Sequence, residues 1–132
     1  MKYELTTNTK IINGFTLRQI RALKDFGDVE KGSLGGWIEK TENLSQDGDA
    51  WVYGDAEVYG NAEVSENAWV YGNAQVFGNA LVSGDAGVSE NAWVYGDALV
   101  YGDALVYGDA EVYGDARVFG NARVSELSLI HI

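Results

Sequence analysis

The feature that most constrains this chain is a six-residue repeat that runs from Ala50 to Val124 without a change of phase. Each repeat reads Ala-x-Val-(Tyr/Phe/Ser)-(Gly/Glu)-(Asn/Asp). A Val recurs at every sixth position from Val52 onward, and an Ala stands two residues before each Val. A short, fixed period over this length is typical of solenoid folds, in which each repeat packs only against its neighbours.

One repeat has the chemistry of a short strand followed by a corner. In an extended chain Ala50 and Val52 point to one face, and Trp51 and Tyr53 point to the other. The Gly-Asp or Gly-Asn pair that follows tolerates the unusual backbone angles of a tight turn. A helix of 3.6 residues per turn would not keep apolar positions spaced by two and six on one face. Because one such strand cannot bury its inner face alone, successive strands must wind and stack.

Three repeats per coil would make a triangular prism with eighteen residues per turn. This spacing resembles the left-handed parallel β-helix of hexapeptide-repeat proteins, in which an aliphatic and a small residue recur six apart. The resemblance covers Leu34 to Glu126 and implies an all-β, single-stranded, left-handed parallel β-helix. The hand is what the resemblance implies, since the spacing alone does not fix it and parallel crossovers are usually right-handed.

Three segments carry a closer resemblance: Arg21–Asp28, Leu34–Glu39 and Val58–Ala62. They are similar to segments of an uncharacterised group of phage and prophage repeat proteins, the YdcK-like proteins among them. The resemblance implies the same repeat fold and a phage or prophage source. It implies no activity.

Residues 1–33 precede the repeats and predict a small β cap. Lys2–Leu5 alternates like a strand, and Asn13-Gly14 between two apolar runs is typical of a two-residue hairpin turn. Arg18–Leu23 fits either a strand or one face of a helix, and we favour the strand. A cap would cover the open strand edge and apolar bore of the solenoid, and six apolar residues are available for it: Phe15, Leu17, Ile20, Leu23, Phe26 and Val29.

The predicted β-helix spans residues 34–126, and its first coil is irregular. Ile38 and Leu44 are six apart and are expected to line the bore, but Val52 follows eight residues later. The segment Gln46–Asp49 is therefore expected to hold a two-residue insertion at one corner. Residues 127–132 leave the repeat and resemble the translation of a sequencing-library adapter, so we expect a non-native tail. The alternative is a natural apolar cap.

The net charge of −11 limits the classes of partner that the chain can bind. No Lys or Arg occurs from Thr41 to Ala116, and an acidic rod repels nucleic acid and anionic membranes. We therefore expect neither as a partner. The chain has no Cys, and Met1–Leu5 does not resemble a secretory signal. These features favour the bacterial cytoplasm or a virion.

The residue types also bear on catalysis. His131 is the only His and lies in the suspected tail. With no Cys and no His in the repeats, neither a zinc site nor a His general base can be assembled there. We therefore predict that the chain is not an enzyme and needs no metal or cofactor.

An outward aromatic patch is the candidate binding site. Trp51 and Trp69 are one coil apart and are flanked by Tyr53 and Tyr71. Such a patch suits a sugar ring or a partner protein, although the same rings could simply pack between coils. We predict a structural or interaction repeat module. The alternative function is a carbohydrate- or receptor-binding segment of a phage fibre. An uncovered C-terminal coil would also favour weak end-to-end self-association.

Overall fold

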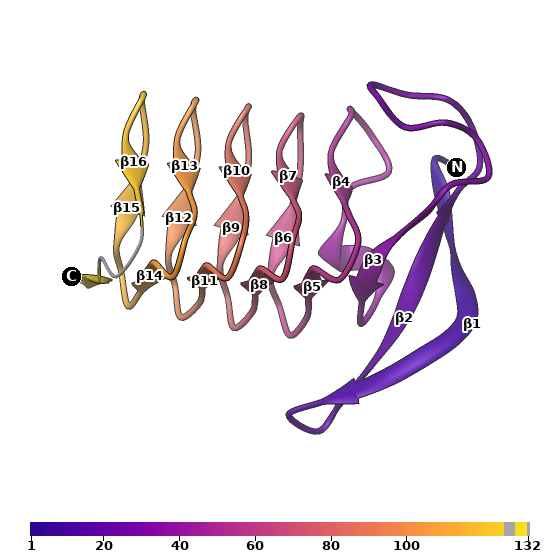
Figure 1. Ribbon diagram of the computed structural model, residues 1–132, viewed down its shortest axis with the longest axis horizontal. Coiled ribbons are helices and arrows are strands. Elements are labelled where there is room, and N and C mark those ends of the chain that lie inside the picture. Colours follow the sequence, from indigo (N-terminus) through magenta and orange to yellow (C-terminus); the bar gives the residue numbers. More distant parts are fainter. Residues whose placement is uncertain (126–128, 132) are drawn as a thin grey trace.

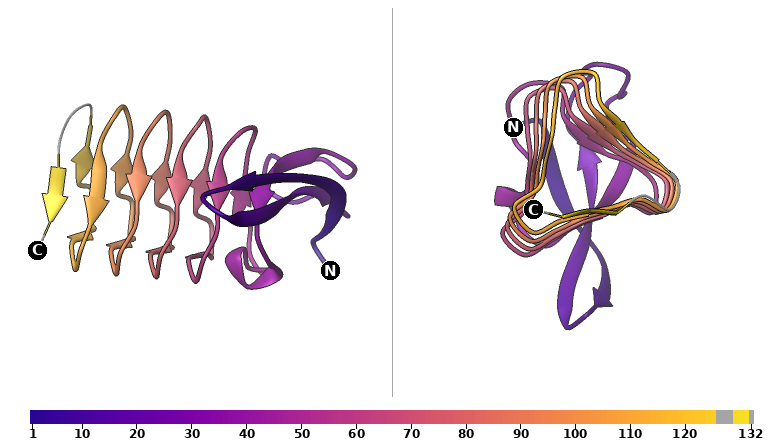
Figure 2. Two further views of the ribbon diagram at one scale, coloured as in Figure 1. Left: turned by 90° about the horizontal axis from the view of Figure 1, so that it is seen from below. Right: turned by 90° about the vertical axis from the view of Figure 1, so that its left-hand side faces the viewer.

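Figure 1 shows the computed structural model of the chain, which describes residues 1–125 and 129–131. A long N-terminal hairpin leads into a column of stacked coils. Seen along the column, the coils superimpose as a triangle, and the hairpin projects beyond one side of it (Figure 2). One 3-10 turn, η1 (Thr41–Asn43), interrupts the strands in the first coil.

Each side of the triangle is a ladder of short parallel strands, and the first sheet also includes the hairpin. The eight-stranded sheet contains, in order of pairing, β1 (Tyr3–Ile12), β2 (Phe15–Ala22), β3 (Leu34–Ile38), β5 (Glu57–Val58), β8 (Gln75–Val76), β11 (Trp93–Val94), β14 (Glu111–Tyr113) and β17 (Leu129–His131). The five-stranded sheet contains β4 (Trp51–Val52), β7 (Trp69–Val70), β10 (Gly87–Val88), β13 (Leu105–Val106) and β16 (Arg123–Val124). The four-stranded sheet contains β6 (Glu63–Val64), β9 (Leu81–Val82), β12 (Leu99–Val100) and β15 (Arg117–Val118).

The strand register confirms the predicted fold, an all-β parallel solenoid with one coil per three repeats. Val52 pairs with Val70, and Val88 pairs with both Val70 and Val106. Register partners on neighbouring regular coils are 18 residues apart, and so are the hydrogen-bonded corner side chains of Asn61 and Asn79. The repeat Val and Ala side chains fill the bore: from Ala50 to Ala116 each is buried at 0% exposure.

The first coil contains the predicted insertion. Ile38 pairs with Val58 and Leu44 bridges to Val64, so each is two residues further from its partner than in later coils. The extra residues form a bend around Gly48, whose φ of 73° lies in the left-handed region. Ile38 and Leu44 are both buried in the bore, as predicted.

The N-terminal hairpin is continuous with the solenoid through β3. β1 and β2 are antiparallel, and Asn13 and Gly14 form the turn with φ values of 50° and 84°. The expected hairpin and the extended Arg18–Leu23 segment are both present, since β2 continues to Ala22. β3 pairs with β2 on one side and with β5 on the other. The domain boundaries at residues 33 and 126 stay predictions.

Side chains of the first coils and the N-terminus satisfy the carbonyls at the open end of the solenoid. Between coils, an N–H of one coil donates to a carbonyl of the next, so the first coil's outer carbonyls need other donors. Lys2 Nζ donates to the carbonyls of Ala50 at 2.7 Å and Gly48 at 3.3 Å. Asn43 Nδ2, in the first coil, donates to the carbonyl of Ala62 in the second coil, where no backbone N–H of the first coil is in register. Burial lowers the pKa of Lys2 to about 8, although nearby carboxylates act in the opposite direction.

The corners are joined by side-chain hydrogen bonds from Asn. Asn61 donates to Asn79 at 3.1 Å, and Asn79 donates in turn to Asp97 at 3.0 Å. Asn67 and Asn91 donate to Asp85 and Asp109 in the same way. An Asn is thus placed to donate to the next corner along the column, which an Asp cannot do.

Within residues 50–125, two corners carry Glu where the others carry Gly, and this leads to a prediction. Glu66 and Glu90 have φ values of 59° and 60°, in the region that favours glycine. We expect Glu90→Gly to raise the free energy of unfolding by about 0.5–1 kcal/mol because it removes this strain. Thermal unfolding checks it. Glu90→Ala is the matched control, since it removes the same charge but keeps a Cβ, and an equal gain in both variants would contradict the backbone argument.

The final strand continues the solenoid. The backbone of β17 pairs in parallel with β14, and Val112 lies opposite Ile130, one coil later. Residues 127, 128 and 132 of the predicted tail lie outside the described residues, and whether residues 127–132 are native stays a prediction. So does the end-to-end association.

Candidate aromatic binding site

The four residues of the predicted patch do not share one environment. Trp51 and Trp69 are register partners in β4 and β7, as the spacing predicts. Their rings nevertheless have different neighbours. The Trp51 ring contacts the N-terminal segment, whereas the Trp69 ring lies over Gly87 in the following coil.

Trp51 belongs to the core and not to the surface. It is 1% exposed, and its ring lies edge-on to Tyr3 at 6.1 Å and to Phe26 at 5.2 Å between centroids. A Cβ added to Gly35 would stand 2.7 Å from Trp51 Cζ2, so the chain closes tightly over the indole. The inclusion of Trp51 in a surface patch is therefore wrong, because the N-terminal segment folds across the first coil.

Tyr53, Trp69 and Tyr71 line an open hollow together with Asp28. We call these four residues the aromatic hollow. Its volume is about 510 Å³, and the rings of Trp69 and Tyr71 are 5.0 Å apart with 33° between their planes. Tyr71 is exposed, while Tyr53 and Trp69 are half-buried. Two rings thus form an aromatic wall, and Asp28 supplies a carboxylate beside it.

Gly87 leaves room for the Trp69 ring because it has no side chain. It occupies the variable position of its repeat in β10, directly after Trp69 in the register. A Cβ there would stand 2.3 Å from the Trp69 six-membered ring. Any other residue would turn the indole away from the next coil. The sequence signal for this is the one Gly between Ala and Val in the whole repeat run.

The polar groups of the hollow include the hydroxyls of Tyr53 and Tyr71 and the carboxylate of Asp28. Burial raises the pKa of Tyr53, and the negative charges of Asp28 and Asp49 raise it further. Tyr53 therefore keeps its proton at neutral pH and can donate a hydrogen bond. Asp28 comes from the loop between β2 and β3, so the hollow joins two parts of the chain that are far apart in sequence.

A second aromatic group, on the eight-stranded sheet, is used in packing. Tyr59, Phe77, Tyr95 and Tyr113 form a stacked ladder with centroids 4.9–5.3 Å apart. Tyr95 also donates to Glu111 at 3.0 Å, and burial, followed by this hydrogen bond, raises the pKa of Tyr95 to about 12.

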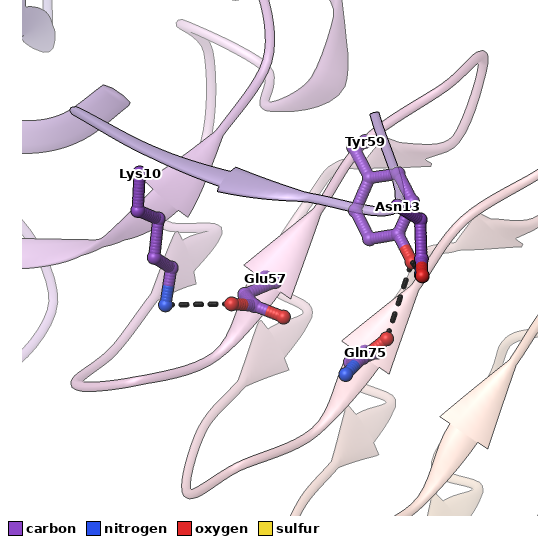
Figure 3. Close-up of polar contacts among 5 residues, drawn as sticks. All are labelled: Lys10, Asn13, Glu57, Tyr59 and Gln75. Atoms are coloured by element: carbon purple, nitrogen blue, oxygen red, sulfur yellow. Dashed lines mark hydrogen bonds and ion pairs between the residues drawn. The ribbon is translucent and has the colours of Figure 1, made fainter. Parts of the chain in front are cut away.

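The hairpin closes the N-terminal end of this ladder (Figure 3). Tyr59 Oη accepts from Asn13 Nδ2 at 3.1 Å and donates to Gln75 Oε1 at 3.2 Å. Lys10 forms an ion pair with Glu57 at 2.6 Å. The Phe15 ring lies 5.1 Å from the Tyr59 ring. These contacts attach the hairpin to the first coils and cover the outer side chain of Glu57 in β5, which is buried.

Within residues 1–125 and 129–131, no three His, Cys, Asp or Glu side chains gather in a way that could hold a metal ion. In the same part of the chain, no helix has the length and apolar character needed to cross a membrane.

Comparison with known proteins supports a β-solenoid repeat. The family model described as the YdcK β-solenoid repeat matches residues 74–90, 92–108 and 110–126, and successive matches start one coil apart. A stretch of 37 residues is 51% identical to "Uncharacterized acetyltransferase YdcK" of Escherichia coli (strain K12). The match covers 28% of this chain and 11% of that relative. The chain therefore corresponds to a small part of the relative's length.

This similarity corrects one prediction. The absence of His and Cys from the repeats led to the prediction that the chain is not an enzyme. That prediction is wrong, because the same repeat occurs in a protein that is named an acetyltransferase. The lack of His and Cys in the repeats excludes His- and Cys-based catalysis only within the repeats themselves. A relative matched over 11% of its length can carry catalytic groups elsewhere.

Proposed function

We propose that this β-solenoid is a binding module whose aromatic hollow takes the ring of a carbohydrate ligand. The observation that carries the proposal is the arrangement of Trp69, Tyr71 and Asp28 around one hollow of about 510 Å³. Small-molecule sites are typically concave, about 300–1,000 Å³ in volume, and mostly apolar with a few polar groups.

The chemistry of the lining suits a sugar. The C–H face of a pyranose ring packs on an aromatic side chain, and its hydroxyls need hydrogen-bond partners at the edge. Asp28 can accept from such a hydroxyl, and Tyr53 can donate to one. The Trp69 ring packs against the next coil in the space left by Gly87, which has no side chain. Because this packing already restricts the ring, little side-chain freedom is lost on binding.

The test is a titration of soluble glycans against tryptophan fluorescence. We expect a saturable change with at least one glycan class. Trp69→Ala should weaken binding about 5- to 150-fold, since stacking of a ligand ring on an aromatic side chain contributes about 1–3 kcal/mol. The matched control is Trp93→Ala, because Trp93 occupies the same repeat position on another sheet and is 41% exposed.

Two results would overturn the proposal. One is the absence of any saturable change across a broad glycan panel. The other is a binding curve that Trp69→Ala and Trp93→Ala alter equally. Asp28→Asn tests the contribution of the carboxylate to binding separately from that of the aromatic rings, since it removes the charge and keeps the shape of the hollow.

We further propose a phage or prophage source for the chain, supported by the resemblance of Arg21–Asp28 and Leu34–Glu39 to segments of that group. Sequencing the intact gene with its neighbours tests it. A location among chromosomal genes with no phage genes nearby would contradict this source.

Acetyl transfer is a second candidate function, and the name of the E. coli relative supports it. The direct test is to incubate the chain with acetyl-CoA and a panel of hydroxyl and amine acceptors, which would take the acetyl group, and to measure the free thiol of CoA. Release above that of a heat-unfolded sample would favour this candidate. If no thiol is released and no acetyl-CoA binds in calorimetry, acetyl transfer does not belong to this segment.

A further inference from the structure

The four-stranded sheet presents an outer face that the hairpin leaves open. Lys10 and Asn13 of the hairpin contact Glu57 and Tyr59 on the eight-stranded sheet. Lys2 and Tyr3, at the base of the hairpin, contact the backbone of the first coil at Ala50 and Leu44. Figure 2 shows the hairpin projecting beyond one side of the triangle only. The outer face of the four-stranded sheet carries two columns of side chains: Glu63, Leu81, Leu99 and Arg117 in one, and Ser65, Ser83, Tyr101 and Phe119 in the other.

The two columns are polarised along the solenoid. The first begins with an acid, ends with a base and has two Leu between them. The second has small Ser side chains in its first half and aromatic rings in its second half. The rings of Tyr101 and Phe119 stack at 5.4 Å with 10° between their planes, so they stand side by side on the face.

The apolar side chains on this face are unusually open. Phe119 is 56% exposed and Leu81 is 38% exposed. Among the residues that the structure describes, neither Glu63 nor Arg117 forms an ion pair within the chain. Neighbouring exposed apolar groups with charges at either end are characteristic of an interaction surface.

We propose that this face binds a second copy of the chain in an antiparallel dimer. The two-fold axis would run parallel to the strands and cross the face between β9 and β12. This operation places Glu63 opposite the partner's Arg117, and Leu81 opposite the partner's Leu99. In the second column it places Ser83 opposite the partner's Tyr101, and Ser65 opposite the partner's Phe119.

Each pairing in this arrangement is complementary. The acid–base pair between Glu63 and the partner's Arg117 is formed twice by symmetry, and each aromatic ring meets a small Ser that leaves room for it. At one corner Asn61 and Asn79 face the partner's Asp115 and the partner's Asp97, which suits an amide-to-carboxylate hydrogen bond. At the other corner Asp85 faces the partner's Asp103, and this pair opposes association.

Other ways of pairing the same face lose this complementarity. In a parallel dimer the first column would face the second, so Arg117 would meet the partner's Phe119 and Glu63 the partner's Ser65. An antiparallel dimer shifted by one coil would place Leu81 against the partner's Arg117. The charges and side-chain sizes therefore favour one orientation and one register.

The size of the face predicts a weak dimer. Four strands at about 4.8 Å each give a length of about 19 Å, and six residues at about 3.3 Å give a width of about 20 Å. The face would thus bury about 400 Å² on each partner, against about 800 Å² in a standard interface. We expect a dissociation constant in the micromolar range or weaker, at fixed ionic strength.

Sedimentation velocity of the full chain over a dilution series tests the proposal. We expect a reversible monomer–dimer equilibrium, which Leu99→Glu should weaken at least about 100-fold because the symmetric interface receives the charge twice. The matched control is Leu105→Glu, a half-buried Leu at the same repeat position on the five-stranded sheet, which should leave the equilibrium unchanged. Circular dichroism of each variant confirms that it is folded.

Charge reversal tests the orientation. Glu63→Arg alone and Arg117→Glu alone should each weaken the dimer about tenfold, and the double variant should restore it. Arg123→Glu, on the five-stranded sheet, should have no effect. A monomer at every concentration overturns the proposal, and so does a dimer that persists in Leu99→Glu. A double variant that fails to recover overturns the antiparallel register.

Discussion

Val88→Asp is expected to lower the free energy of unfolding by more than about 4 kcal/mol, with a fall in melting temperature of at least about 12 °C. Val88 is 0% exposed and lies in β10 between Val70 and Val106. The substitution removes an apolar contact in each direction and places an unpaired carboxylate in the bore. Thermal unfolding followed by circular dichroism measures the loss.

The control for Val88→Asp is an outward substitution in the neighbouring column. Tyr107→Ser places at Tyr107 the residue that already stands one coil earlier, at Ser89. Because the Tyr107 ring contacts no other aromatic ring within residues 1–125, we expect a loss below about 1 kcal/mol. Similar losses in the two variants would show that the inward and outward positions have been assigned incorrectly.

Tyr95 would be a poor control for the same experiment. It is an outward residue of the same repeat position, but it stacks on Phe77 and Tyr113 and donates to Glu111. An outward position is therefore not equivalent to a dispensable one. Its contribution depends on what stands eighteen residues before and after it, which the repeat pattern leaves variable.

The period alone predicted the parts of the fold that depend on local geometry. Inward Ala and Val, the corner after each strand and the two-residue insertion before Val52 follow from alternation and counting. The Asn13-Gly14 turn follows from its backbone preferences. All of these are decided within a few residues of chain, so a single sequence contains the information.

The site could be predicted only in part because long-range contacts decide it. The stacking of Trp69 beside Tyr71 follows from the spacing, but Asp28 joins them from a loop with no repeat to place it. The burial of Glu57 likewise depends on Lys10, which reaches it from the hairpin. The pattern places side chains on a face and does not show what folds across that face.

The clearest example is Trp51, for which we expect the second large effect. Trp51→Ala should lower the free energy of unfolding by about 3–5 kcal/mol, since it leaves a large cavity in a closed environment. The loss should be concentrated at the N-terminal end, because the indole contacts Tyr3 in β1 and Phe26 in the loop before β3. Hydrogen exchange should show faster opening of β1 and β2 than of the strands from β10 to β13.

Trp93→Ala is the matched control, because both Trp residues occupy the variable position of the repeat. Trp93 is 41% exposed and contacts Phe77 and Tyr95 only edge-on, at 6.1 and 6.4 Å. We expect Trp93→Ala to lower the free energy of unfolding by no more than about 1.5 kcal/mol and to leave hydrogen exchange in β1 and β2 unchanged. If both variants lose the same stability, or if Trp51→Ala leaves the hairpin protected, Trp51 does not hold the N-terminal segment against the first coil. In that case the hairpin must be attached by other contacts, such as the Lys10–Glu57 ion pair and the Asn13–Tyr59 hydrogen bond.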